Sequence, residues 1–118
     1  MKLLFVYNAD SGVANALLDS VHKVLSPSTY NCNLCDITFD IISEKKEWKQ
    51  FREASSIEMI FLHKDVFLKQ YRSKWLPKYE FPIILSEEND GLEIYITSEV
   101  INNLEDSKAL IQEITKRR

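Results

Sequence analysis

The only two cysteines of the 118-residue chain, Cys32 and Cys35, are separated by two residues in the stretch TYNCNLCD. Two intervening residues in a turn bring the sulfur atoms close enough to form a disulfide, so the spacing suits reversible dithiol chemistry. The same spacing suits two thiolates that bind one tetrahedral zinc ion. A structural interpretation also stands, because free cysteine is often buried and packs like a small apolar side chain. The sequence leaves these three interpretations open.

A closed zinc site needs two further ligands, and the two histidines, His22 and His63, are the candidates. His22 falls in a predicted helix, and His63 at the end of a predicted strand. Neither distance from the cysteines matches a zinc-finger pattern, so zinc binding would depend on the tertiary arrangement. A partly exposed structural residue is the simpler interpretation of each histidine.

Hydrophobic patterning predicts the elements that position these residues. The apolar run at 3–7 is typical of a strand buried on both faces. We expect helices at about 11–25, 44–54, 64–73 and 98–116, a strand at 57–62, and a hairpin of strands at 82–85 and 92–97. The hairpin turn ends at Gly91, which permits positive φ. Residues 28–43 contain turn-forming residues, the two cysteines and a short alternation of Ile37, Phe39 and Ile41, which we interpret as a strand or an ordered loop.

Composition predicts one soluble globular domain, with 45% apolar and 28% charged residues. No apolar run approaches the length of about 20 residues that spans a bilayer, and none resembles a signal peptide. We therefore expect a cytoplasmic protein without a membrane partner. Cytoplasmic thiols are kept reduced, which disfavours a permanent structural disulfide.

Charge is distributed unevenly along the chain despite a net charge of only −3. Residues 63–79 contain five basic residues and one acid, whereas residues 80–107 contain eight acids and no base. The two segments could neutralise each other within the fold or across a homodimer. Phe67, Tyr71, Trp75 and Tyr79 recur every fourth residue between the bases, and we expect them to pack in the core. The overall acidity argues against nucleic acid as a partner.

A central strand and helix, a later strand and helix, and a hairpin led by Phe81-Pro82 with a final helix together resemble the thioredoxin-like fold. This resemblance implies an α/β domain with a mixed sheet that covers residues 1–118, with a cysteine-bearing insertion at about 28–56. Pro82 is similar to the cis-proline of that fold, although the sequence does not decide whether its peptide bond is cis. Catalytic members place their cysteines at the start of the helix after the first core strand. This chain has Asn8 to Ser11 there, so we expect no exchange at the usual position.

Three stretches, LLFVYNADSG, ALLDSVHK and SPSTYNCNLC, are similar to a small family of uncharacterised bacterial proteins, some labelled GTPase. A phosphate loop requires closely spaced glycines followed by a lysine and Ser or Thr. The chain has two glycines, Gly12 and Gly91, and no such motif. We therefore reject nucleotide hydrolysis.

These observations lead to two functional hypotheses. In the first, the chain is a redox or redox-sensing protein in which Cys32 and Cys35 exchange disulfides with a protein or small thiol, at a site outside the usual thioredoxin position. In the second, it is a non-catalytic binding or scaffold module. Its cysteines would then be structural or bind zinc, with His22 or His63 as further ligands. Substrate and oligomeric state do not follow from the sequence.

Overall fold

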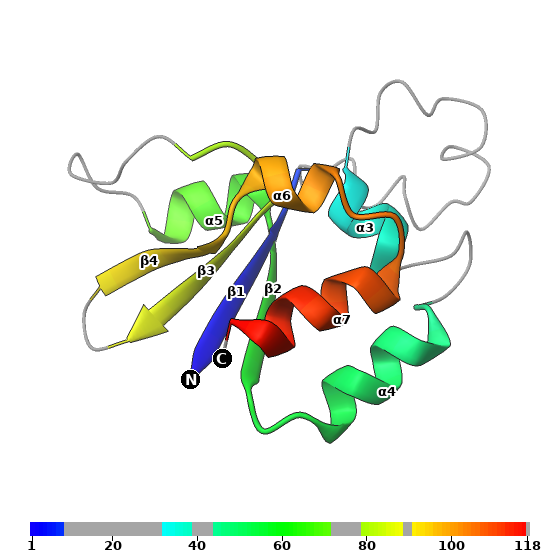
Figure 1. Cartoon of the computed structure of the whole chain (residues 1–118). Coiled ribbons are helices and arrows are strands. Elements are labelled where there is room, and N and C mark those ends of the chain that lie inside the picture. The colour runs from blue at the N-terminus through cyan, green and yellow to red at the C-terminus, as the bar shows by residue number, and fades with distance from the viewer. Residues whose placement is uncertain (9–31, 39–43, 72–78, 89–90, 118) are drawn as a thin grey trace.

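The computed structural model describes residues 1–8, 32–38, 44–71, 79–88 and 91–117 (Figure 1). The elements in these ranges form an α/β fold with one mixed sheet, a C-terminal hairpin and a final helix, which confirms the predicted fold class. In chain order they are β1 (Lys2–Tyr7), α3 (Asn33–Thr38), α4 (Lys46–Ala54), β2 (Glu58–His63), α5 (Lys64–Gln70), β3 (Ile83–Glu88), β4 (Gly91–Ile96), α6 (Ser98–Asn102) and α7 (Ser107–Lys116).

The sheet has the strand order β2-β1-β3-β4. β1 pairs in parallel with β2, so that Tyr7 lies opposite His63. β3 runs antiparallel to β1, with Ile83 opposite Val6, and β4 runs antiparallel to β3. The carboxyl ends of β1 and β2 therefore share one edge of the sheet with the amino end of β3.

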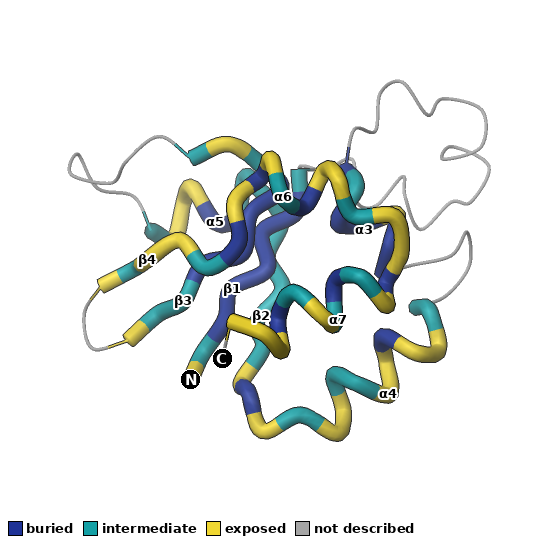
Figure 2. Tube along the Cα trace, in the orientation of Figure 1, coloured by how far each residue is buried: buried dark blue, intermediate teal, exposed yellow. Residues whose placement is uncertain are grey.

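β1 is buried on both faces, as its continuous apolar run predicts (Figure 2). Because side chains alternate along a strand, Leu3, Phe5 and Tyr7 pack with residues of α3, α4, α6 and α7. Leu4 and Val6 pack on the opposite face in a cluster that includes Phe67 of α5. Trp48 of α4 is fully buried, and its ring lies edge-on to that of Phe5 at 5.6 Å between centroids.

Three of the aromatic residues spaced every fourth position, Phe67, Tyr71 and Tyr79, pack in the cluster on the α5 face of the sheet. Phe67 is fully buried, and Tyr71 and Tyr79 pack against the same cluster. The ring centroids of Phe67 and Tyr71 are 5.2 Å apart. The predicted core role is confirmed for these three residues, whereas Trp75 lies outside the described residues.

The final helix predicted at 98–116 is wrong, because the structure contains two helices there. The Thr97 side chain accepts a hydrogen bond from the Val100 N–H and caps α6, and Asp106 does the same for α7 through the Ala109 N–H. Each cap satisfies a backbone donor that has no partner within its own helix. The hydrophobic spacing continues across the break, which is why it suggested one helix.

The hairpin is present, but the conformation expected at its turn is not. Gly91 does not have positive φ; it is the first residue of β4 and pairs with Glu88. The other turn residues, 89 and 90, lie outside the described residues. The helix predicted at about 11–25, including His22, also lies outside them.

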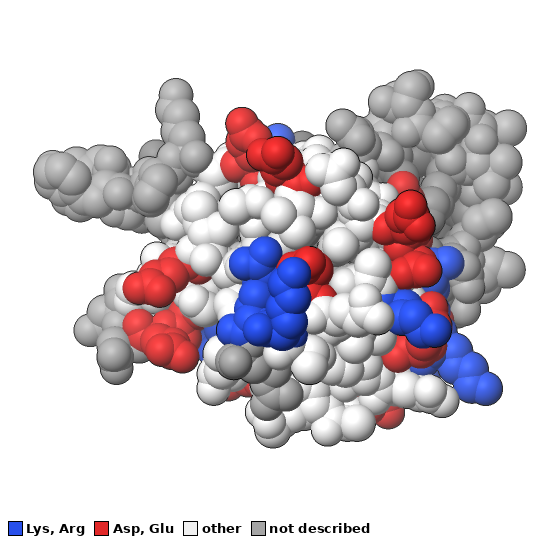
Figure 3. All heavy atoms as spheres, in the orientation of Figure 1, with Lys and Arg blue, Asp and Glu red and all other residues white. Residues whose placement is uncertain are grey.

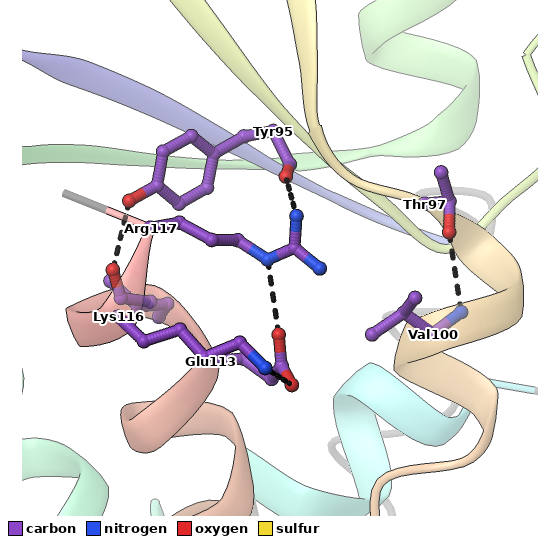
Figure 4. Close-up of polar contacts among 7 residues, drawn as sticks. Tyr95, Thr97, Val100, Glu113, Lys116 and Arg117 are labelled. Carbon is purple, nitrogen blue, oxygen red and sulfur yellow. Dashed lines mark hydrogen bonds and ion pairs between the residues drawn. The ribbon is translucent and has the colours of Figure 1, made fainter.

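Polar contacts join the C-terminal end of α7 to β4 (Figure 4). The Tyr95 hydroxyl donates to the Ile114 carbonyl at 2.8 Å, and Arg117 donates to the Tyr95 carbonyl at 3.3 Å. Glu113 accepts from Arg117 and forms an ion pair with Lys116. The Ile114 carbonyl lies in the last turn of α7, where carbonyl groups lack partners within the helix.

We predict that Tyr95→Phe lowers the free energy of unfolding by about 0.5–1.5 kcal/mol, the usual net value of one hydrogen bond. The substitution keeps the ring and removes only the hydroxyl that binds the Ile114 carbonyl. Urea unfolding of the two proteins measures the difference. Equal stabilities would show that solvent replaces this hydrogen bond without cost.

A second polar cluster joins β1 to β3 near the end of the sheet where β1 begins. Lys2 of β1 forms an ion pair with Glu87 of β3 at 2.8 Å. Its hydrogen bond lowers the pKa of Glu87 below the ordinary 4.5, and a hydrogen bond from Tyr71 acts in the same direction. Figure 3 shows acidic and basic side chains interspersed on the face seen there, among the residues drawn in colour.

The lowered pKa of Glu87 makes a pH-dependent contribution to stability. A carboxyl whose pKa is lowered by folding stabilises the protein above its unfolded-state pKa, and this contribution is lost as the pH falls through the folded-state value. We therefore predict that Glu87→Gln destabilises the protein near neutral pH and has no effect below that value. Denaturant unfolding of the wild type and of Glu87→Gln, from neutral pH down to below the folded-state pKa of Glu87, measures the stability difference. A stability difference independent of pH would contradict the prediction.

No helix in the described ranges is both long and apolar enough to cross a membrane.

Candidate disulfide site

Cys32 lies directly before the first residue of α3. Its carbonyl accepts a hydrogen bond from the Asp36 N–H at 3.1 Å, which is the first helical bond of this segment. The strand or loop predicted for the alternation of Ile37, Phe39 and Ile41 is wrong at Ile37, which lies in α3, and the other two residues lie outside the described residues. The cysteine-bearing segment expected as an insertion contains this helix, and Cys32 lies at its start. Leu34, Ile37 and Thr38 are buried at helical spacing on one side of α3. The sequence pattern was misread because Ile37, Phe39 and Ile41 also alternate as in a strand.

The structure joins Cys32 and Cys35 in a disulfide, with their Cα atoms 5.3 Å apart. This separation falls within the range of about 4.4–6.8 Å that disulfides require. Two backbone N–H groups donate to the Cys32 sulfur: that of Cys35 at 3.3 Å and that of Asn8, which follows β1, at 3.4 Å. The two donors come from segments that are far apart in the sequence. Cys32 is thus held at the junction of β1 and α3.

Both cysteines lie in the apolar interior. Cys32 is 1% exposed and Cys35 is 5% exposed, and both belong to the cluster that contains Phe5 and Tyr7. Thr38, at the other end of α3, is also buried, and its hydroxyl donates to the Leu34 carbonyl at 2.7 Å. The helix therefore buries a polar residue without leaving its hydroxyl unpaired.

The cysteines lie beside the edge of the sheet where β1 ends. Tyr7 pairs with His63 of β2, and their rings are 5.8 Å apart. On the other side of β1, Ile83 pairs with Val6, so Pro82 lies one step further toward the end of β1. The Phe81-Pro82 peptide bond is cis, which the sequence left undecided. Proline, histidine and disulfide thus come from separate segments to one end of the sheet.

The residues considered for zinc are not brought together among the residues described. No group of three or more His, Cys, Asp or Glu side chains within these ranges could hold a metal ion. His63 packs on Tyr7, and its buried Nδ1 atom has no hydrogen-bond partner in the described part of the chain. His22 lies outside the described residues, so the zinc alternative stays a prediction.

Sequence reasoning missed Asn8 and Asn33 as parts of the site. Asn8 acts through its backbone N–H, which side-chain patterns do not reveal. The Asn33 side chain donates to the carbonyls of Ile101 and Leu104, about 70 residues later in the chain. Its position between the two cysteines was the available signal, but the partners are set by tertiary structure.

Comparison of the chain with protein-family models, with curated proteins and with solved structures gives no match in any of the three.

Proposed function

We propose that the protein is a thiol-disulfide exchange protein that uses Cys32 and Cys35 as its redox pair. The observation that carries this proposal is the position of the two cysteines at disulfide distance in the first turn of α3, with two backbone N–H groups directed at one sulfur. Hydrogen bonds of this kind stabilise a thiolate, which is the reactive form in exchange. Cys32 is accordingly the nucleophile and Cys35 the resolving thiol.

The reaction transfers two electrons between the cysteine pair and a disulfide substrate. The Cys32 thiolate attacks one sulfur of the substrate, forms a mixed disulfide and releases one substrate thiolate. The Cys35 thiolate then attacks the Cys32 sulfur, forms the internal disulfide and releases the second substrate thiolate. The two protons from the protein thiols end on the released thiols at neutral pH. Reduction of the protein follows the same steps in reverse.

A thioredoxin-like core is part of this proposal. The sheet order, the helix that begins at the cysteine pair after β1, and the proline before β3 support the resemblance suggested by the sequence. We interpret the cysteines as the counterpart of the usual pair, displaced along the chain by residues 9–31. This interpretation replaces the expectation of activity in a separate loop.

The burial of both sulfurs favours a small thiol as the exchange partner. Attack on a disulfide requires the incoming sulfur to approach along the S–S axis, and Cys32 is only 1% exposed. Glutathione presents a small thiol on a flexible peptide, so it needs less displacement of the surroundings than a folded protein does. We expect reduced glutathione to reduce the pair faster than an equal concentration of a protein dithiol.

Thiol titration combined with elemental analysis tests the proposal against the zinc alternative. After reduction and removal of the reductant, the native protein is expected to react with two equivalents of a thiol reagent, and with none after treatment with oxidised glutathione. Stoichiometric zinc in protein purified without chelators would favour the metal site instead. If the protein is free of metal and its thiols react only after denaturation, the exchange proposal is wrong and the two cysteines are structural.

A further inference from the structure

The side chain of Asn33 connects the cysteine-bearing turn to another part of the fold. Its amide nitrogen donates to the Ile101 carbonyl at 2.6 Å and to the Leu104 carbonyl at 2.9 Å. An asparagine amide carries two donor hydrogens, so these contacts use its full donor capacity. Both acceptors lie at the carboxyl end of α6 or just beyond it. The Ile101 carbonyl also accepts from the Leu104 N–H at 3.1 Å, so the Asn33 amide is an additional donor to it.

The acceptors of these hydrogen bonds belong to α6 and the residues just after it, a packed part of the fold. Ile101 is fully buried, and α6 is capped at its start by the Thr97 side chain. Asn33 is the first residue of α3 and lies between the two cysteines. The amide therefore joins the turn that holds both sulfurs to the carboxyl end of α6, and both of its donor hydrogens are used there.

We propose that Asn33 is a positioning residue for disulfide exchange, which sets how readily the reduced pair closes into a disulfide. This inference rests on the proposed function. In the closing step, the Cys35 thiolate attacks the Cys32 sulfur of a mixed disulfide with glutathione and releases glutathione thiolate. Holding the backbone of the first turn keeps Cys35 close to Cys32 in the dithiol as well as in the disulfide. The fixed geometry raises the effective concentration of one thiol toward the other.

Removal of the amide is expected to make the internal disulfide easier to reduce. In Asn33→Ala the reduced turn samples more conformations, so ring closure loses part of its entropic advantage. If the reduced and oxidised states differ by about the net strength of one ordinary hydrogen bond, the exchange equilibrium with glutathione changes about three- to tenfold. A tenfold change is a shift of about 30 mV toward more oxidising potentials.

The experiment measures the exchange equilibrium of wild type, Asn33→Ala, Asn33→Ser and Asn33→Asp in glutathione buffers, together with the thermal midpoint of each oxidised protein. Serine keeps one donor hydrogen and is expected to give an intermediate shift. Aspartate keeps the size of the side chain but loses both donors, so its shift should equal or exceed that of alanine. Asn103→Ala is the matched control, because Asn103 directly follows α6 and its amide donates at 2.9 Å to the Glu99 carbonyl of that helix, four residues earlier.

The expected result is a shifted equilibrium for the Asn33 variants and an unchanged one for Asn103→Ala. If Asn33→Ala or Asn33→Ser lowers the thermal midpoint but leaves the equilibrium within about twofold of wild type, Asn33 is only structural and the inference is wrong. Failure of the proposed function has a different signature, since wild type itself would then form no reversible disulfide.

Discussion

Replacing Cys35 with serine is expected to trap one glutathione per chain on Cys32, whereas replacing Cys32 with serine should trap little or none. The reason lies in the donors to the Cys32 sulfur, which come from the backbone N–H groups of Asn8 and Cys35. A backbone donor survives substitution of the side chain, so the Cys35→Ser variant retains both donors to the Cys32 thiolate. No resolving thiol remains in this variant, and the mixed disulfide accumulates.

Intact-mass measurement after incubation with oxidised glutathione determines the extent of trapping in each variant. The matched pair differs only in which cysteine remains, so it separates nucleophile from resolving thiol. Neither variant can form the internal disulfide. The rate of thiol-disulfide exchange in the presence of either variant should therefore equal the rate in buffer without protein. Preferential trapping on Cys35 would reverse the assignment of roles, and rapid exchange by either variant would contradict a two-cysteine mechanism.

A large stability effect is expected for Ile96→Ala, with a loss of about 2–5 kcal/mol in the free energy of unfolding. Ile96 is fully buried and packs in the same cluster as Phe5 and the cysteine pair. Shortening it removes buried surface and leaves a cavity. Because typical domains are stable by only about 5–15 kcal/mol, such a loss is a large fraction of the total.

Ile94→Ala is the matched control, since Ile94 lies two residues earlier on β4 and is 52% exposed. Its replacement should change the free energy of unfolding by less than about 0.5 kcal/mol, as is usual on the surface. Chemical denaturation of the three oxidised proteins gives both values. Similar losses for the two variants would contradict the burial of Ile96 described above.

Elements with a strong local signal were predictable from sequence. The apolar run of β1 identified the central strand, and the amphipathic spacing around Trp48 identified α4. Pro82 and the two apolar runs after it identified the hairpin of β3 and β4. In each case the local pattern and the tertiary environment favour the same structure, so the prediction needed no knowledge of distant contacts.

The site was less predictable because its geometry depends on contacts between distant segments. The spacing of Cys32 and Cys35 was compatible with a disulfide, a zinc site or packed free thiols, and the helix that follows was missed. α3 is short, and its stability depends on packing with α6 and α7 as much as on its own sequence. The Asn8 donor and the Asn33 contacts span 24 and about 70 residues respectively. The same limit applies to the break between α6 and α7, where two side-chain caps override continuous hydrophobic spacing.

The most direct test of the exchange proposal is a redox titration of the wild-type protein in glutathione buffers, with the free thiols trapped by alkylation and counted by mass spectrometry. We predict a reversible two-electron transition confined to Cys32 and Cys35, with a midpoint between about −270 and −180 mV. A pair that stays fully reduced or fully oxidised across this range, or a transition that does not reverse, would contradict the account.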